Sequence, residues 1–100
     1  MNAWVLYDIE SSPNGDRRRQ KIAKQIQRFG LMRIQKSVFC GALESNRLDE
    51  LILFSRNLIE EKVDSVYIFP MCDKDYNAVT LIGQGFDKDL VANRKRELFL

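Results

Sequence analysis

The sequence predicts one α+β domain of the ferredoxin-like type, a βαββαβ sandwich with an antiparallel sheet. The predicted elements follow one another as strand, helix, strand pair or bent strand, helix, strand and strand. Both helices are amphipathic, so they can cover one face of the sheet. A length of 100 residues with 45% hydrophobic content leaves room for a single core. We assign residues 1–86 to this domain and residues 87–100 to a C-terminal strand or tail that could pair with a partner subunit.

The first strand is predicted over Ala3–Ile9, where large apolar and aromatic residues continue without a polar interruption up to Asp8. Such a run is typical of a central strand that is buried on both faces. A carboxylate at the end of a buried strand loses solvation, so Asp8 needs a cation, a hydrogen-bond donor or a proton. The residues that follow, Ser11–Asp16, have the composition of a turn.

The first helix is predicted over Asp16–Phe29, and Gly30 is expected to end it in the left-handed conformation. One face of this helix is apolar, and the opposite face carries cations at three- and four-residue spacing. The cations are Arg17, Lys21, Lys24 and Arg28. Most basic helix faces are simply solvated, and this is the alternative for the last two.

The middle of the chain, Leu31–Leu43, resembles a strand, but its alternation breaks at Lys36. This break indicates either a bulge in one bent strand or a tight turn between two short strands. A second amphipathic helix is predicted over Glu44–Lys62, with Ser45 as its N-cap.

The last predicted elements are the strand Asp64–Met71, ended by Pro70, the polar turn Asp73–Asn77 and a further strand at Ala78–Gly83. Apolar residues occupy both alternating positions of the strands. The sheet face away from the helices is therefore expected to be buried too, most simply against a second copy of the chain.

The composition excludes several kinds of catalytic site. The chain contains no histidine, which rules out Ser-His-Asp and Cys-His catalysis and any histidine metal site. Cys40 and Cys72 lack CxxC spacing, so we expect them to be small buried hydrophobes rather than zinc ligands. With no signal peptide and no long apolar segment, the chain is expected to be cytoplasmic, without membrane contact.

Charge is distributed unevenly although the net charge is only +2. Basic residues concentrate between Arg17 and Lys36, which favours a phosphate-binding region. A strand-end carboxylate such as Asp8, followed by clustered arginines, suits a hard divalent metal ion and a phosphate. In the plainer alternative Asp8 caps a turn or pairs with an arginine, and spacing alone favours that alternative.

Several motifs in a fixed order resemble a known family. They are Val5-Leu6-Tyr7-Asp8-Ile9, Arg17-Arg18-Arg19, Phe29-Gly30, Arg33-Ile34-Gln35-Lys36-Ser37-Val38-Phe39, Asp64-Ser65-Val66-Tyr67-Ile68-Phe69-Pro70 and Val79-Thr80-Leu81-Ile82-Gly83. Over residues 3–86 the combination resembles the small CRISPR-associated adaptation proteins, also known as CRISPR-associated endoribonucleases, which are the compact partners of the spacer-acquisition integrase.

This resemblance implies a homodimer of ferredoxin-like subunits in which the Asp8 side chains of the two copies face each other. The paired acids are proposed to hold magnesium (or manganese), so Asp8 is implied as both the catalytic and the metal-binding residue. The resemblance and the basic surface also indicate nucleic-acid-binding residues. They are Arg17, Arg18, Arg19, Lys21, Arg33, Lys36 and Ser37.

The implied function is CRISPR adaptation with metal-dependent endonucleolytic cleavage of single-stranded RNA or double-stranded DNA, in a prokaryotic cytoplasm. The alternative is a dimeric DNA-binding scaffold that has no chemistry of its own and serves the CRISPR-associated integrase. A third possibility, an RNA-recognition module on the same fold, is disfavoured. The segment Lys36–Gly41 lacks the glycine and aromatic spacing that base stacking needs.

Overall fold

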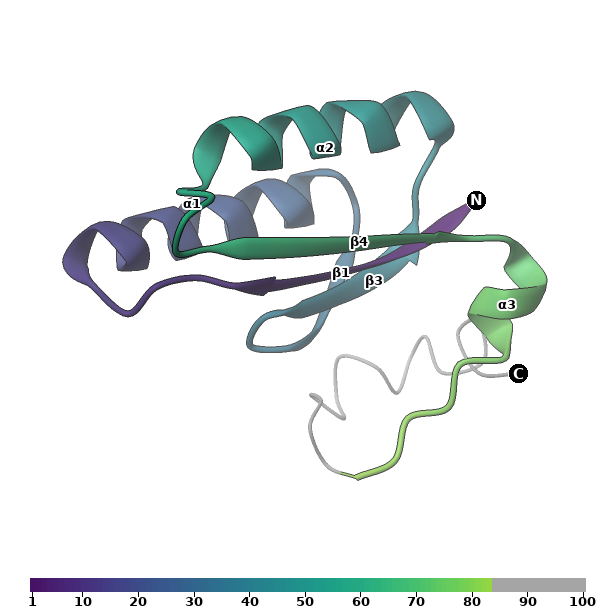
Figure 1. Cartoon of the computed structure of the whole chain (residues 1–100). Helices are drawn as coiled ribbons and strands as arrows, with labels where there is room; N and C mark the ends of the chain where they lie inside the picture. Colours follow the sequence, from purple (N-terminus) through teal and green to yellow (C-terminus); the bar gives the residue numbers. More distant parts are fainter. Residues whose placement is uncertain (84–100) are drawn as a thin grey trace.

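The computed structural model describes residues 1–83 and shows a two-layer α+β sandwich (Figure 1). The four-stranded antiparallel sheet has the strand order β2-β3-β1-β4, and α1 and α2 lie together on one of its faces. This topology confirms the predicted ferredoxin-like fold. The elements are β1 (Asn2–Asp8), α1 (Pro13–Arg28), β2 (Met32–Gln35), β3 (Val38–Ala42), α2 (Ser45–Leu58), β4 (Ser65–Met71) and α3 (Asp73–Asn77).

Strand β1 lies at the centre of the sheet and is antiparallel to both β3 and β4. Because side chains alternate along a strand, Val5 and Tyr7 point into the core beneath the helices, whereas Trp4 points to the opposite face. Val5 is fully buried and Trp4 is only 8% exposed. The prediction of a central strand buried on both faces is confirmed for this part of β1.

Helix α1 begins three residues earlier than predicted, at Pro13 instead of Asp16. The predicted turn is wrong here because Ser12 caps the helix, with its Oγ accepting a hydrogen bond from the Gly15 N–H at 2.9 Å. Proline suits the first helical position because it has no N–H to satisfy. At the other end Gly30 has φ 94°, which confirms the expected left-handed conformation.

The segment 31–43 forms two short strands instead of one bent strand. A tight turn at Lys36 and Ser37 joins β2 to β3, and the pairing of the two strands shifts its register between Arg33 and Gln35. Both features that the sequence left open, a turn and an irregular register, are therefore present.

Helix α2 ends at Leu58, four residues before the predicted end. The chain leaves the helix because the buried Asp64 carboxylate accepts a hydrogen bond from the Glu60 N–H at 2.9 Å, which turns the chain toward β4. The predicted N-cap is also wrong. The capping position is occupied by Glu44, without a side-chain hydrogen bond, and Ser45 is already helical.

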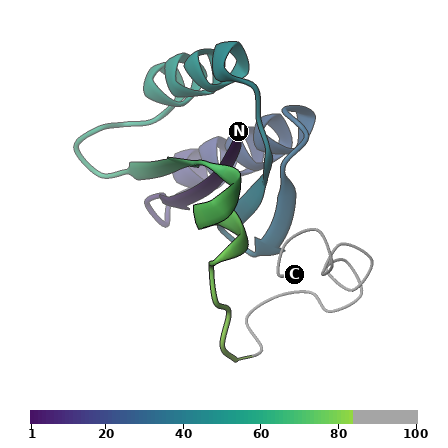
Figure 2. The same cartoon turned by 90° about the vertical axis from the view of Figure 1, so that its right-hand side faces the viewer.

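The sheet face away from α1 and α2 carries a second, smaller apolar cluster. Its buried members are Trp4, Met32, Ile34, Cys40 and Tyr76. Tyr76 belongs to α3, so the predicted polar turn Asp73–Asn77 is a short helix. Figure 2 shows α3 on the opposite side of the sheet from α2. Its one apolar side chain reaches this cluster, which the sequence composition of the segment did not indicate.

The predicted strand Ala78–Gly83 is wrong, since no strand pairing forms over these residues. Val79 and Leu81 instead pack their side chains against the smaller cluster. The alternation of apolar residues therefore reflects packing on the sheet face, which needs no partner strand.

The two cysteines lie in different environments. Cys40 is buried as expected, and its burial raises the pKa of the thiol above its ordinary value. Cys72 is exposed, so the expectation of burial is wrong for this residue.

The predicted tail, residues 87–100, and the predicted domain boundary at residue 86 lie outside the described residues. Among the helices of residues 1–83, none has both the length and the apolar composition needed to cross a membrane.

Candidate nucleic-acid interface and strand-end carboxylate

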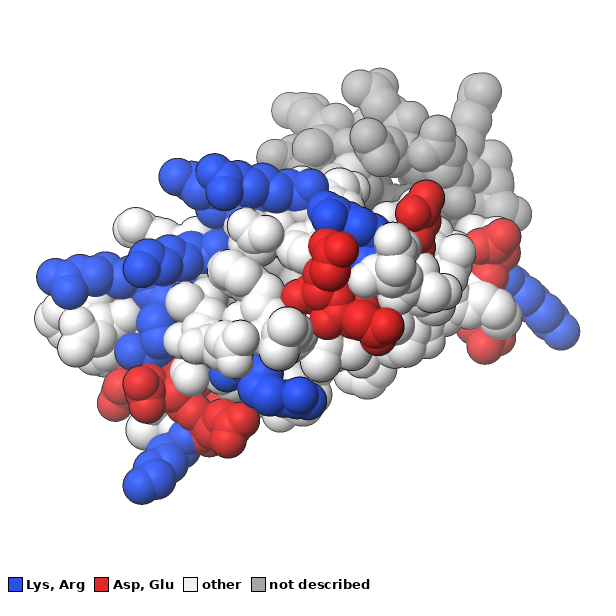
Figure 3. All heavy atoms as spheres, turned by 90° about the horizontal axis from the view of Figure 1, so that it is seen from above, with Lys and Arg blue, Asp and Glu red and all other residues white. Residues whose placement is uncertain are grey.

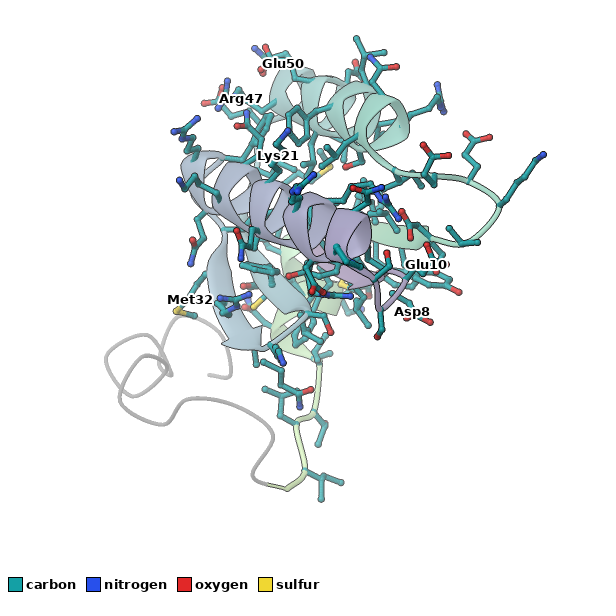
Figure 4. The ribbon with its side chains drawn as sticks, turned by 90° about the vertical axis from the view of Figure 1, so that its left-hand side faces the viewer. Asp8, Glu10, Lys21, Met32, Arg47 and Glu50 are labelled. Atoms are coloured by element: carbon teal, nitrogen blue, oxygen red, sulfur yellow. The ribbon has the colours of Figure 1, made fainter. Side chains whose placement is uncertain are left out.

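Asp8 is the last residue of β1 and lies opposite Ser65 of β4 in the sheet register. By alternation it shares the face of Trp4 and Leu6, and Figure 4 shows its side chain directed away from the helix layer. The side chain is exposed, which corrects the expectation that a buried strand end would desolvate it.

The carboxylate of Asp8 also has no hydrogen-bond or ion-pair partner within residues 1–83. The plainer alternative, a turn cap or an arginine pair, is therefore not realised in the described part of the chain.

The three consecutive arginines have different environments because successive residues of a helix point about 100° apart. Arg17 is exposed, and its Nη1 donates to Asn14 Oδ1 at 3.3 Å. Arg18 is bound to the buried Asp64, with Nε to Oδ2 at 2.7 Å and Nη2 to Oδ1 at 3.2 Å. Arg19 donates from Nη2 to the backbone carbonyls of Ile9 at 2.7 Å and of Glu10 at 3.0 Å.

Asp64 is a buried acid beside the site that the sequence did not single out. Its side chain has no exposure and accepts four hydrogen bonds, two from Arg18 and one each from the N–H groups of Glu10 and Glu60. The bond to the guanidinium of Arg18, helped by the two backbone donors, lowers the pKa of Asp64 from 3.8 to about 2. The same hydrogen bond raises the pKa of Arg18.

A groove of about 730 Å³ runs beside α1 and the β2–β3 turn. It is called the basic groove below, and its charged lining residues are Asp16, Arg17, Arg19, Lys21, Lys24, Arg33 and Lys36. The single acid among them is bound by the guanidinium of Arg19. Figure 3 shows several lysine and arginine side chains side by side on the helix layer. The groove therefore presents an excess of positive charge to any polyanion.

Arg33 forms a wall of the basic groove and is half-buried. Its guanidinium lies over the Phe39 ring, 5.1 Å from the centroid, and Nη2 donates to the carbonyl of Lys36 at 2.8 Å. Nη2 also approaches the hydroxyl of Tyr7 at 3.4 Å. Arg33 thus combines a structural role in the turn with a positive charge at the groove.

The structure brings five of the seven predicted nucleic-acid-binding residues to the basic groove and leaves out Arg18 and Ser37. Ser37 is half-buried in the turn, where its carbonyl accepts the Tyr7 N–H at 3.2 Å. Lys24 joins the groove although its sequence pattern also fitted a solvated face. The three-residue spacing between Lys21 and Lys24 places both side chains on the same side of the helix, and this was the sequence signal for its position.

These features describe a small ferredoxin-like protein with a groove for polyanions and an unpaired acid at the end of its central strand. The family model described as CRISPR associated protein Cas2 matches residues 1–79. The chain therefore belongs to the CRISPR-associated Cas2 family, which confirms the resemblance drawn from its motifs.

Two similar proteins cover most of the chain. A CRISPR-associated endoribonuclease Cas2 from Korarchaeum cryptofilum is 37% identical over 87 residues, which is 85% of this chain and 87% of that protein. A CRISPR-associated endonuclease Cas2 from Halalkalibacterium halodurans is 36% identical over 84 residues, which is 83% of this chain and 86% of that protein.

Two solved structures share the fold. The crystal structure of Streptococcus pyogenes Cas2 superposes with a TM-score of 0.72 at 26% identity, covering 83% of this chain and 100% of the other. A hypothetical protein from Thermus thermophilus gives a TM-score of 0.68 at 31% identity, covering 84% of this chain and 92% of the other.

Proposed function

We propose that the chain is a metal-dependent endonuclease that acts as a homodimer on RNA or DNA, with Asp8 as its catalytic and metal-binding residue. The observation that carries this proposal is the Asp8 carboxylate, exposed at the end of the central strand and unpaired within residues 1–83. The names of the relatives, endoribonuclease and endonuclease, support it. Membership of the family supports a role in spacer acquisition beside an integrase, in the cytoplasm of a prokaryote.

One copy of the chain offers too few ligands for a divalent ion at Asp8. Within residues 1–83, no three His, Cys, Asp or Glu side chains gather into a metal site. A carboxylate is the hard oxygen donor that magnesium takes, and magnesium commonly binds one or two carboxylates while keeping several waters. The Asp8 side chains of two copies would meet this need. Magnesium, when bound, supplies positive charge that favours the developing negative charge on a scissile phosphate.

The second copy is proposed to bind the sheet face away from the helices. On this face Tyr67 and Phe69 of β4 are 54% and 46% exposed, and their rings stack with centroids 6.5 Å apart. Exposed aromatic residues beside an apolar cluster are typical of an interaction surface. Because Asp8 lies on the same face, a face-to-face dimer would hold both acids between the subunits.

The basic groove is proposed to hold the nucleic-acid backbone. Arg17, Lys21, Lys24 and Lys36 are exposed at the groove, so their charges are available to phosphates. Such contacts position a nucleic acid without reading its sequence, and they weaken as salt rises. Arg18 is left out of this surface because Asp64 already occupies its guanidinium.

A specific observation favours the second candidate function, a scaffold that binds DNA for the integrase without cutting it. Lys21 of the basic groove and Asp8 point to different sides of the molecule (Figure 4). A backbone could therefore be held in the groove of one subunit without reaching the Asp8 of that subunit.

The Asp8→Asn variant separates the two functions. Asparagine is nearly isosteric and accepts hydrogen bonds but lacks the negative charge that a hard cation needs. We expect magnesium- or manganese-dependent cleavage of single-stranded RNA and of double-stranded DNA to fall to background. Nucleic-acid affinity should stay the same or rise slightly, because two negative charges near the phosphates are removed. Asp49→Asn, which neutralises an exposed acid on α2, is the matched control and should keep full cleavage.

Unchanged cleavage by highly purified Asp8→Asn protein would contradict the assignment of the active site. If wild-type protein does not cleave above background with either metal, the scaffold is the better function. In that case spacer acquisition should survive Asp8→Asn and fail when Arg17 and Lys21 are neutralised.

A further inference from the structure

The backbone of Glu10, two residues beyond Asp8, is held at both its N–H and its carbonyl group. The Glu10 N–H donates to Asp64 Oδ1 at 2.9 Å, and the Glu10 carbonyl accepts Arg19 Nη2 at 3.0 Å. The same Nη2 binds the carbonyl of Ile9 at 2.7 Å. Arg19 of α1 and Asp64, the residue before β4, therefore fix the chain immediately after the strand-end acid.

A third contact comes from the first turn of α1. Gly15 is buried, and a Cβ placed on it would lie 1.9 Å from the backbone oxygen of Glu10. No side chain can be accommodated at that distance without moving the loop. The Ser12 Oγ holds Gly15 in this position by accepting its N–H at 2.9 Å. Only glycine lets the helix approach the Glu10 carbonyl this closely.

We infer that Asp64, Arg19 and Gly15 are positioning residues that fix the backbone of Glu10 and thereby the direction of the Asp8 Cα–Cβ bond, which carries the carboxylate. Asp64 acts from two sides, because the residue after it, Ser65, is the register partner of Asp8 in the sheet. None of the three forms a hydrogen bond or an ion pair with the Asp8 side chain, so each acts through the backbone. The part of this inference that concerns cleavage rests on the proposed function, whereas the part that concerns geometry does not.

Two variants disturb the backbone of Glu10 without replacing an exposed cation of the basic groove. One acts at the Glu10 N–H and the other at the Glu10 carbonyl. In Asp64→Asn the new NH2 group must face either the Arg18 Nη2 and Glu10 N–H donors or the Arg18 Nε and Glu60 N–H donors. In Gly15→Ala the added methyl collides with the Glu10 oxygen. Glu50→Gln, which breaks the surface pair with Arg47 at 2.8 Å, is the matched control.

The first readout is geometric and uses metal-free protein. Residual dipolar couplings of the Asp8 Cα–Cβ bond and of the N–H bonds of Ile9 and Glu10, measured by NMR on labelled protein, should fit a single backbone conformation in wild type and in Glu50→Gln. In Asp64→Asn and in Gly15→Ala they should be reduced by averaging or should fit a changed direction of the Asp8 Cα–Cβ bond. Averaging of this bond already in wild type would overturn the inference even if a variant failed to fold, and so would an unchanged bond direction in both folded variants.

The second readout separates positioning from binding. Both variants should lower kcat by about 10- to 100-fold, the range expected when a reacting group is misplaced by about 1 Å. The Kd for nucleic acid should stay within roughly twofold, because the exposed phosphate-binding cations are intact. An equal loss in Kd and kcat, or no loss in either, would overturn the positioning role. Absence of cleavage in wild type would instead count against the proposed function and leave the NMR test of positioning standing.

Discussion

Arg17, Arg18 and Arg19 are neighbours in sequence, yet only Arg17 is exposed, while the other two are half-buried. Arg18 is bound to a buried acid, and Arg19 is bound to two carbonyls and to Asp16. The guanidinium groups of Arg18 and Arg19 are therefore already bound within the protein, whereas that of Arg17 is accessible to a phosphate. Sequence alone gives the first two equal weight as phosphate contacts, whereas the structure distinguishes them.

Substitution of Arg17 and of Arg18 should consequently have different effects. Arg17→Gln should weaken nucleic-acid binding about equally for unrelated sequences and reduce the slope of log K against log salt by about one. Arg18→Gln should leave that slope unchanged and lower the urea midpoint of unfolding, because Asp64 stays buried without its cation. Fluorescence anisotropy at several salt concentrations and urea titration measure the two effects. A reduced salt slope in Arg18→Gln would place this side chain at the interface after all.

Asp64 should make the stability of the fold depend on acid pH. Its pKa in the folded chain is about 2, below the ordinary value of 3.8, so its contribution is complete above about pH 4. As the pH falls from 4 toward 2, protonation should remove roughly 2 kcal/mol of unfolding free energy. Urea unfolding at pH 5 and at pH 2.5 would show this loss. Asp64→Asn should lack this component of the pH dependence, whereas Glu50→Gln should retain it.

The position of Asp8 could be predicted from sequence because a short apolar run and its end are local features. The link between Arg18 and Asp64 could not, since 46 residues separate them and only the completed fold brings the first turns of α1 beside the residue that precedes β4. The exposure of Asp8 was also missed, because alternation assigns a residue to a face but does not say what covers that face.

At the scale of elements, the two helices differ in how their first turns are capped. Ser12 caps α1 through its side chain, whereas Ser45 lies inside the first turn of α2 and makes no capping hydrogen bond. Ser12→Ala should therefore lower the free energy of unfolding by about 1 kcal/mol. Ser45→Ala should change it by only a few tenths, because alanine is a good helix former. Equal losses in urea titration would mean that Ser12 does not act as a cap.

Helices and paired strands were predictable because the period of their apolar residues is a local signal. Residues 78–83 were not, because an alternating apolar segment fits both a paired strand and an extended coil packed on a sheet face. Val79 and Leu81 satisfy the apolar requirement by side-chain contact alone. Similarly, the polar composition of Asp73–Asn77 concealed that its single aromatic residue anchors a short helix.

At the scale of the whole molecule, the exposed aromatic pair on β4 leads to a prediction about assembly. Phe69→Glu would put a charge into the proposed contact and should convert a dimer to a monomer in light scattering at micromolar concentration. Leu53→Glu is the control, because Leu53 is 57% exposed on α2, on the opposite side of the molecule. A wild-type protein that is already monomeric at that concentration would contradict the proposed homodimer.

The alternation along β1 has a consequence for how genes of this kind can change in length. Val5 and Tyr7 face the helices while Leu6 and Asp8 face away. The face on which the acid lies is therefore set by whether an even or an odd number of residues separates it from the core residues of the strand. Gain or loss of a single codon within β1 would send the acid into the apolar core and an apolar side chain to the place of the acid. Exchanges among hydrophobic residues of similar volume would be tolerated at the same positions. Selection on this strand should therefore act more strictly on its count of residues than on the identity of most of them.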